Sequence, residues 1–124
     1  IKNQILDILN NLKTQSSANE LAQAIRKNKQ RDLLSYLVAA CWKNGLDYTE
    51  FIDDFIEIFI QYDYLLALDA FTVIENSTRN LSNIFLNSRI NKLKNHVSEV
   101  DDSKKVLTRE LIHILHSKKE DQSD

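Results

Sequence analysis

Apolar residues recur at every third or fourth position along most of the chain, which is the spacing of one face of an α-helix. The clearest case is the segment 47–76, which predicts two apolar helices joined by a turn of about three residues. Helices joined by so short a turn pack antiparallel, as one helical hairpin. The second helix is apolar around most of its circumference, so we expect it at the centre of the core.

Residues that can cap helices recur at a regular interval. Ser17, Asp47 and Thr78 are predicted to open the first helices of successive pairs, 30 and 31 residues apart. Asp32 and Asp63 are predicted to open second helices, again 31 residues apart. An amphipathic helix precedes Ser17 and another follows a turn at 101–103, so the chain is predicted to be all-α with about seven helices.

Hairpins repeated at this interval predict a short α-solenoid, in which each antiparallel pair of helices stacks on the next. A bundle of helices with short turns and no regular stacking would show similar spacing and is the alternative. A bend or break is predicted near residues 87–88, where the apolar spacing of the segment 78–100 changes. Gly45 marks the clearest helix end, because glycine tolerates the left-handed backbone that ends a helix.

Composition supports this fold class and limits the chemistry. A single Gly and no Pro in 124 residues are too few for the tight turns of a sheet protein. We predict one α-helical domain over residues 1–117, followed by a frayed or disordered tail over 118–124 that has no apolar residue to bury. The lone cysteine, Cys41, excludes an internal disulfide and indicates a reducing compartment. No segment is apolar enough for a signal peptide or a membrane span, so we expect a cytoplasmic protein.

The segment 62–76, YDYLLALDAFTVIEN, has an aspartate near the interhelix turn and an alanine inside the apolar helix that follows, here Asp63 and Ala70. In this it resembles the second helix of a HEAT or armadillo-type repeat, although the arginine often found after the turn is absent. The resemblance covers residues 17–76. The same stretch is similar to small bacterial helical proteins with no assigned activity. What the resemblance implies is a scaffold or binding role, and it brings no catalytic residue and no cofactor.

Charge is distributed unevenly along the chain. The net charge is +4 over residues 1–31, −8 over 32–76 and +2 over 77–124. Four acids of the middle block, Glu50, Asp53, Asp54 and Glu57, fall within an arc of about 100 degrees on one predicted helix. Because these carboxylates repel one another, the face favours a basic partner, either another protein, a second copy of this chain or the chain's own basic segment. A solvated acidic face without function is the simpler alternative.

Two tyrosines, Tyr48 and Tyr62, lie at the two ends of the same predicted helix. In a solenoid the turns between helices align along one edge, so we predict that both tyrosines extend the partner-binding surface. Packing of the rings at helix ends, with the hydroxyls outward, is equally consistent with the sequence.

Catalytic and metal chemistry have less support. Glu110, His113 and His116 lie on one predicted helix at spacings of three, but they supply fewer ligands than a zinc or di-iron site requires. Cys41 follows apolar positions and is predicted to be buried and inert. No glycine-rich phosphate loop or nucleophile elbow is present, so we predict a non-enzymatic protein without metal or cofactor. A ligand-binding bundle is an alternative, and it would need a closed polar pocket containing Glu110 or His113.

The segment 78–97 has four bases and no acid: Arg79, Arg89, Lys92 and Lys94. A nucleic-acid-associated helical module that uses this segment is the main alternative function. RNA-binding sites usually add stacking aromatic residues, and the segment has only Phe85, which we expect to be buried. The acidic balance of the whole chain also opposes attraction to phosphate. The favoured prediction is therefore a helical scaffold that mediates protein–protein interaction.

Overall fold

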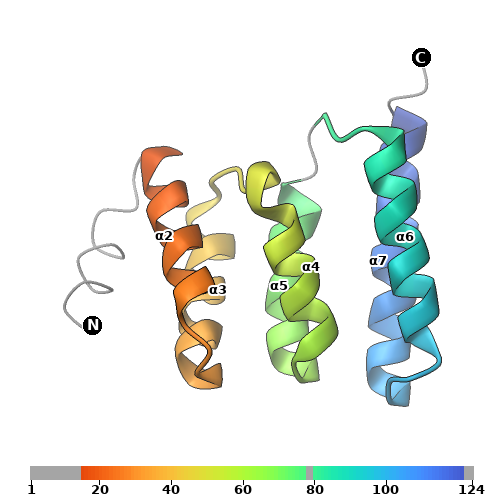
Figure 1. Ribbon diagram of the computed structural model, residues 1–124, viewed down its shortest axis with the longest axis horizontal. Helices are drawn as coiled ribbons and strands as arrows, with labels where there is room; N and C mark the ends of the chain where they lie inside the picture. Colours follow the sequence, from red (N-terminus) through yellow and green to blue (C-terminus); the bar gives the residue numbers. More distant parts are fainter. Residues whose placement is uncertain (1–14, 78–79, 122–124) are drawn as a thin grey trace. The chain divides into compact units, whose positions relative to one another are not determined.

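Every regular element in the described part of the chain is helical. The computed structural model describes residues 15–77 and 80–121 (Figure 1). The helices are α2 (Gln15–Lys27), α3 (Arg31–Asn44), the short 3₁₀ helix η1 (Thr49–Phe51), α4 (Ile52–Gln61), α5 (Tyr64–Asn76), α6 (Asn83–Val97) and α7 (Asp102–Asp121). These ranges contain no strand, which confirms the all-α prediction. The predicted first helix and the predicted cap Thr78 lie outside the described residues, so the count of about seven helices stays a prediction.

The contacts of the chain gather into two compact units. Unit 1 comprises residues 1–77, described from residue 15, and unit 2 comprises residues 78–124, described over 80–121. The single domain predicted over residues 1–117 stays a prediction, because caps and apolar spacing report only on single helices and their nearest neighbours.

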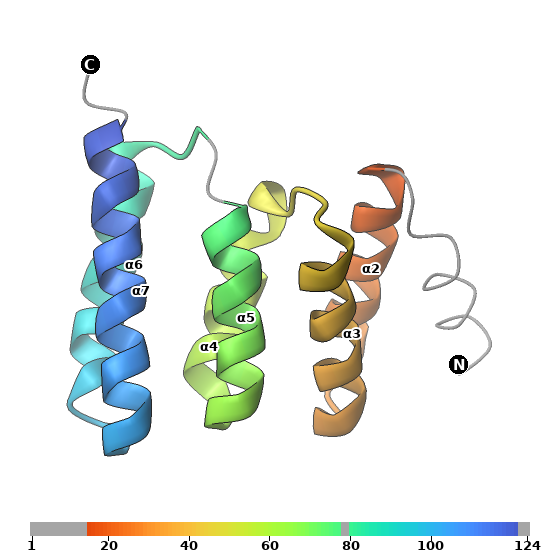
Figure 2. The same cartoon turned by 180° about the vertical axis from the view of Figure 1, so that it is seen from behind.

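Unit 1 consists of two antiparallel hairpins, α2 with α3 and α4 with α5. Figures 1 and 2 show α2 and α4 in one layer and α3 and α5 in the other. Helix α5 packs against both α3 and α4, as expected for the helix at the centre of the core. Its outer side is less covered than the sequence indicated, since Leu65 is 66% exposed. The buried residues of α5 are Leu66, Ala67, Ala70, Val73 and Ile74.

The first two predicted caps are corrected by the structure. Ser17 lies inside α2, which begins at Gln15. Asp32 lies in the first turn of α3, and the cap is Gln30, whose side-chain oxygen accepts a 2.8 Å hydrogen bond from the Leu33 amide. Glutamine has a longer side chain than the usual capping residues, so a pattern based on Ser, Thr, Asp and Asn does not find it.

The turn between α3 and α4 is also built differently from its prediction. Gly45 ends α3 with a left-handed φ of 69°, as expected. Asp47 does not open the helix as predicted: its carboxylate accepts a 3.1 Å hydrogen bond from the Thr49 backbone amide, and the N-cap position falls on Tyr48. This local turn leads into η1 before α4 begins at Ile52. Short side chains such as Asp form these local turns in competition with helix caps.

An ion pair links the N-terminal ends of α3 and α5, the second helices of the two hairpins. Asp63 stands at the N-cap of α5, as predicted, but its side chain makes no capping hydrogen bond. It instead accepts two hydrogen bonds from the Arg31 guanidinium, of 2.8 Å from Nε and 2.6 Å from Nη2. These bonds lower the pKa of Asp63 to about 2. The pair is solvent-exposed, so it fixes the register of the hairpins more than it adds stability.

The loop between α3 and α4 is fastened to the end of α5 at Ser77. The backbone amide of Tyr48 donates a 3.0 Å hydrogen bond to the Ser77 hydroxyl, and the Thr49 hydroxyl donates to the Ser77 carbonyl. The Tyr48 ring packs edge-on against Phe55, with ring centroids 5.7 Å apart. The Tyr48 hydroxyl accepts a 2.8 Å hydrogen bond from Asn44. Tyr48 and Ser77 are both fully buried.

Unit 2 is a hairpin of α6 and α7. Helix α6 begins after its cap Ser82, whose hydroxyl accepts from the Phe85 amide at 3.1 Å, and it runs without the predicted break at 87–88. The apparent change of spacing arises because Ile84 is exposed and does not belong to the buried face. The buried leucines and isoleucine that join the two helices are Leu86, Ile90, Leu93, Leu107, Leu111 and Leu115.

Helix α7 begins after the predicted turn, where the Asp101 carboxylate accepts a 3.1 Å hydrogen bond from the Lys104 amide. It ends at Asp121, so residues 118–121 of the predicted tail are helical. Lys118 and Lys119 lie in its last turn, where positive charge is favourable, and the Lys119 ammonium donates to the Asn87 side chain. Within the described ranges, no helix has the length and apolar content needed to cross a membrane.

Candidate functional site

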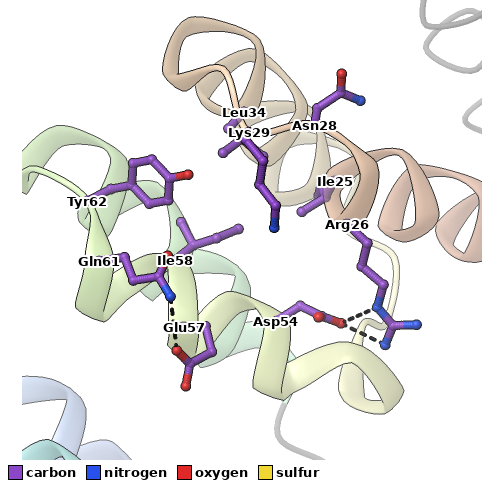
Figure 3. Close-up of a pocket in the computed structure, with 10 residues that line it drawn as sticks. All are labelled: Ile25, Arg26, Asn28, Lys29, Leu34, Asp54, Glu57, Ile58, Gln61 and Tyr62. Carbon is purple, nitrogen blue, oxygen red and sulfur yellow. Dashed lines mark hydrogen bonds and ion pairs between the residues drawn. The ribbon is translucent and has the colours of Figure 1, made fainter.

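A pocket of about 230 Å³ lies in unit 1 between the C-terminal end of α2 and the side of α4 (Figure 3). Its position follows from the packing of the two hairpins. They meet mainly through α3 and α5, while α2 packs on α3 and α4 packs on α5. The two outer helices are therefore held on the same side of unit 1 without closing on each other.

The two walls of the pocket carry opposite charges. Helix α2 and the residues after it supply Arg26 and Lys29, and α4 supplies Asp54 and Glu57. Arg26 bridges the walls at one end, with its Nε and Nη2 at 3.0 and 2.8 Å from Asp54 Oδ2. The same guanidinium lies over the Phe51 ring, 5.4 Å from its centroid. This end of the pocket is closed by a neutralised ion pair.

In the middle of the pocket, Lys29 and Glu57 carry opposite charges but do not form an ion pair with each other. Lys29 extends into the space between α2 and α4 and makes no ion pair with any described residue (Figure 3). On the opposite wall, the Glu57 carboxylate accepts a 3.3 Å hydrogen bond from the side-chain amide of Gln61, one turn later. Tyr62, half-buried at the end of α4, borders the pocket beside Gln61.

Apolar side chains form the floor between the charged walls. Ile25, Leu34 and Ile58 come from α2, α3 and α4 respectively, and all three are buried. A charged wall on each side and an apolar floor give the pocket three different kinds of surface. Such a combination can orient a small ligand, because each part of the ligand meets a different chemistry.

The structure places the four predicted acids along the exposed side of η1 and α4. Glu50 and Asp53 are exposed, and Asp54 and Glu57 are half-buried. Asp54 and Glu57 line the pocket, whereas Glu50 and Asp53 lie outside it. The single acidic face of the sequence is thus divided into an outer pair of carboxylates and a pair that belongs to the pocket.

The two predicted tyrosines, Tyr48 and Tyr62, differ in how far they are buried. Tyr62 borders the pocket, next to the acids with which it was grouped. Tyr48 is fully buried and contacts Phe55 and Ser77 inside unit 1, so its inclusion in a partner-binding surface is wrong. The short helix η1 turns the backbone after Tyr48, which directs the ring inward; a helix assumed to begin at Asp47 does not predict this.

Sequence reasoning missed the basic half of the site. Arg26, Lys29 and Gln61 did not stand out, since single bases and amides near helix ends are common on solvated surfaces. The sequence did carry one signal, the repeat of similar hairpins about 30 residues apart. If such hairpins stack, the first helix of one hairpin lies beside the first helix of the next. That repeat identifies neighbouring helices, but it does not identify which side chains meet.

Over residues 80–97, the described part of the basic segment, no open stacking surface is formed. Arg79 lies outside the described residues. The Arg89 guanidinium lies over the Phe85 ring at 4.4 Å from its centroid and donates a 2.9 Å hydrogen bond to the Ser88 hydroxyl. Lys92 and Lys94 are exposed. The aromatic ring that could stack on a base is therefore covered by the chain's own arginine.

The remaining candidates are placed as follows. Glu110 and His113 are exposed on α7 and do not line the pocket. The described residues contain no group of three or more His, Cys, Asp or Glu side chains arranged to hold a metal ion. Cys41 is buried, as predicted, and burial raises the pKa of its thiol to about 12. Trp42 is partly exposed and its indole donates a 3.1 Å hydrogen bond to Asp69.

None of the family models, curated proteins and solved structures with which the chain was compared matches it.

One polar atom in unit 2 is buried without a partner. The Nε2 atom of His96, near the end of α6, makes no hydrogen bond among the described residues. Lys104, on α7, is also buried and lies close enough to act on the imidazole through its charge. Burial and this charge lower the pKa of His96, and Glu99 opposes the shift. Unit 2 thus favours the neutral form of this histidine.

We expect unit 2 to lose stability as the pH falls from about 7.5 to 5. A histidine whose pKa is lowered by folding binds protons more readily in the unfolded chain, so the loss begins near its ordinary pKa of 6.5. His96→Gln should remove most of this pH dependence, while His113→Gln, at an exposed site, should keep it. Hydrogen exchange of the α6 amides across this pH range measures both variants. Equal pH dependence in His96→Gln and the unmodified chain would contradict the expectation.

Proposed function

We propose that unit 1 is a non-enzymatic protein-interaction module that binds a basic segment of a partner protein along η1 and α4. The observation that carries this proposal is the exposed pair Glu50 and Asp53, which continues the line of the pocket acids Asp54 and Glu57 along one side of the helix. Glu50 and Asp53 are exposed outside the pocket, so a basic segment of a partner meets these two carboxylates first.

We further propose that the hairpins of this chain form a short HEAT-like or armadillo-like stack. The side-by-side packing of α3 and α5 supports this arrangement in unit 1. The ion pair between Arg31 and Asp63 adds support, because it joins equivalent ends of the two second helices. In such a stack the first helices share one face, and the acids of α4 are presented beside α2. We place the module in the cytoplasm on the basis of its single cysteine.

The proposal is tested with two labelled peptides, one alternating lysine and serine and one alternating glutamate and serine. We expect the full chain to bind the lysine peptide, and to bind it less tightly as salt is added, because exposed charges are screened. Glu50→Lys with Asp53→Lys should weaken this binding by about tenfold or more, because attraction is replaced by repulsion at the same place. Fluorescence anisotropy measures the dissociation constants.

The matched control carries the same change of net charge on unit 2. Glu99→Lys with Glu110→Lys replaces two exposed acids of unit 2 by two bases and leaves the residues of η1 and α4 unchanged. It should leave binding of the lysine peptide within about twofold of the unmodified chain, since every acid of the proposed surface is kept. If both double variants weaken binding equally, only net charge matters and the proposed surface is wrong. If the unmodified chain binds neither peptide, the proposal of a basic partner fails.

A further inference from the structure

The pocket between α2 and α4 presents a positive group and a negative group on opposite walls above an apolar floor (Figure 3). We propose that it binds a free α-amino acid with an apolar side chain. Such a molecule carries one carboxylate, one ammonium group and one apolar branch on a single carbon atom. Each of these three parts has a counterpart in the pocket. The proposal is independent of the peptide-binding surface, which depends on Glu50 and Asp53.

Lys29 is the group for the ligand carboxylate. Its side chain extends into the pocket and has no ion-pair partner among the described residues. The other base of this wall, Arg26, is already engaged by Asp54 at 2.8 Å. An entering carboxylate therefore gains a full positive charge at Lys29 without breaking an existing ion pair. Hydrogen bonds between charged groups are shorter and stronger than those between neutral groups.

Glu57 is the group for the ligand ammonium. Its carboxylate lies on the α4 wall and accepts a 3.3 Å hydrogen bond from the Gln61 amide, a distance slightly longer than is typical for a strong bond. A carboxylate has room for several donors, so the amide and an ammonium group can be accepted together.

The floor and the size of the pocket select the rest of the ligand. Ile25, Leu34 and Ile58 offer aliphatic contacts for a branched side chain. The volume of about 230 Å³ is below the usual range of about 300–1,000 Å³ for pockets that hold drug-sized molecules. One small molecule fits, and a larger cofactor does not. A charged or strongly polar side chain would lose hydration against this floor without gaining a partner.

Ligands with only one charge fit the pocket less well. A simple anion is attracted by Lys29 but repelled by Glu57, and a simple cation meets the reverse. A molecule with both charges gains at both walls. The same reasoning separates a free amino acid from the end residue of a peptide, because either end of a peptide keeps only one of the two charges.

The test uses L-leucine added to the isotopically labelled full chain, followed by amide chemical shifts in NMR spectra. We expect saturable shifts at residues of α2 and α4 around the pocket. N-acetyl-L-leucine, which lacks the ammonium, and L-leucinamide, which lacks the carboxylate, should each bind about tenfold more weakly or not at all. L-Alanine should also bind more weakly, because it fills less of the apolar floor.

Two variants assign the groups, and one variant serves as the control. Lys29→Ala and Glu57→Gln should each weaken leucine binding by about tenfold or more. Both changes remove a charge without removing a buried apolar contact, so the fold is expected to persist, and the amide spectrum shows whether it does. Lys27→Ala removes an exposed lysine at the end of α2, two residues before Lys29, that does not line the pocket, and should leave binding unchanged.

Three outcomes would overturn the proposal. The first is the absence of any saturable shift with leucine up to its solubility limit. The second is equal binding of leucine and either of its single-charge analogues, which would mean that the opposite walls do not act together. The third is full leucine binding by Lys29→Ala or Glu57→Gln. In Glu50→Lys with Asp53→Lys, leucine binding should persist, so that failure of the peptide-binding surface and failure of the pocket are told apart.

Discussion

Alanine in place of Phe55 is expected to lower the free energy of unfolding of unit 1 by about 3–5 kcal/mol. Phe55 is completely buried on α4, and its ring meets the edge of the Tyr48 ring at a centroid distance of 5.7 Å. Truncation removes the apolar contacts of the ring and leaves a cavity that helices packed on several sides cannot close. A loss of this size is comparable to the whole stability of many small helical units.

Hydrogen exchange of the α3, α4 and α5 amides measures how much Phe55→Ala lowers the free energy of unfolding of unit 1. Chemical denaturation of the full chain gives a second measurement. Leu65→Ala is the matched control, because this apolar residue of α5 is 66% exposed. It should cost about 0.5 kcal/mol or less, as is usual for surface substitutions. A cost of Phe55→Ala no larger than that of Leu65→Ala would show that Phe55 is not part of a packed core.

Ser77→Ala is expected to destabilise unit 1 by about 1–3 kcal/mol, a large effect for the loss of one oxygen atom. The Ser77 hydroxyl accepts the 3.0 Å hydrogen bond of the Tyr48 amide, and both residues are fully buried. Alanine leaves that amide without an acceptor and without water, so the cost is the desolvation of a buried donor. The ring contact between Tyr48 and Phe55 depends on the same loop, and should loosen with it.

The specific readout is hydrogen exchange of the Tyr48 amide, which should accelerate strongly in Ser77→Ala. Ser98→Ala, at an exposed position after α6, controls for the removal of a serine hydroxyl and should leave unit 1 unchanged. Unchanged protection of the Tyr48 amide in Ser77→Ala would mean that the loop is held in place by packing alone.

Much of the helical layout follows from local chemistry that the sequence displays. The glycine at position 45 ends α3 in a left-handed conformation, and Asp101 opens α7, because both effects involve only neighbouring residues. Asp47 was misread, and the roles of Gln30 and Ser77 were missed, for a different reason. The side chain of each residue can hydrogen-bond to different backbone groups. Which bond forms depends on the residues that the rest of the fold brings close to it.

The candidate site shows the same division between local and distant information. The line of acids on α4 follows from helical spacing alone. The pairing of Arg26 with Asp54 joins residues 28 positions apart, and the approach of Lys29 to the same space depends on how two hairpins stand side by side. Nothing in the local pattern separates Arg26 and Lys29 from other bases at helix ends. The burial of Tyr48 required the 3₁₀ turn that follows it.

The burial of Cys41 gives this chain an internal reporter of its own opening. It is the single cysteine in the sequence, it lies on α3 with only 1% of its surface exposed, and its thiol has a pKa of about 12. A thiol-specific reagent needs both access and a thiolate, and the closed unit offers neither. The rate at which such a reagent labels Cys41 therefore reports how often unit 1 opens, and no cysteine has to be introduced for the measurement.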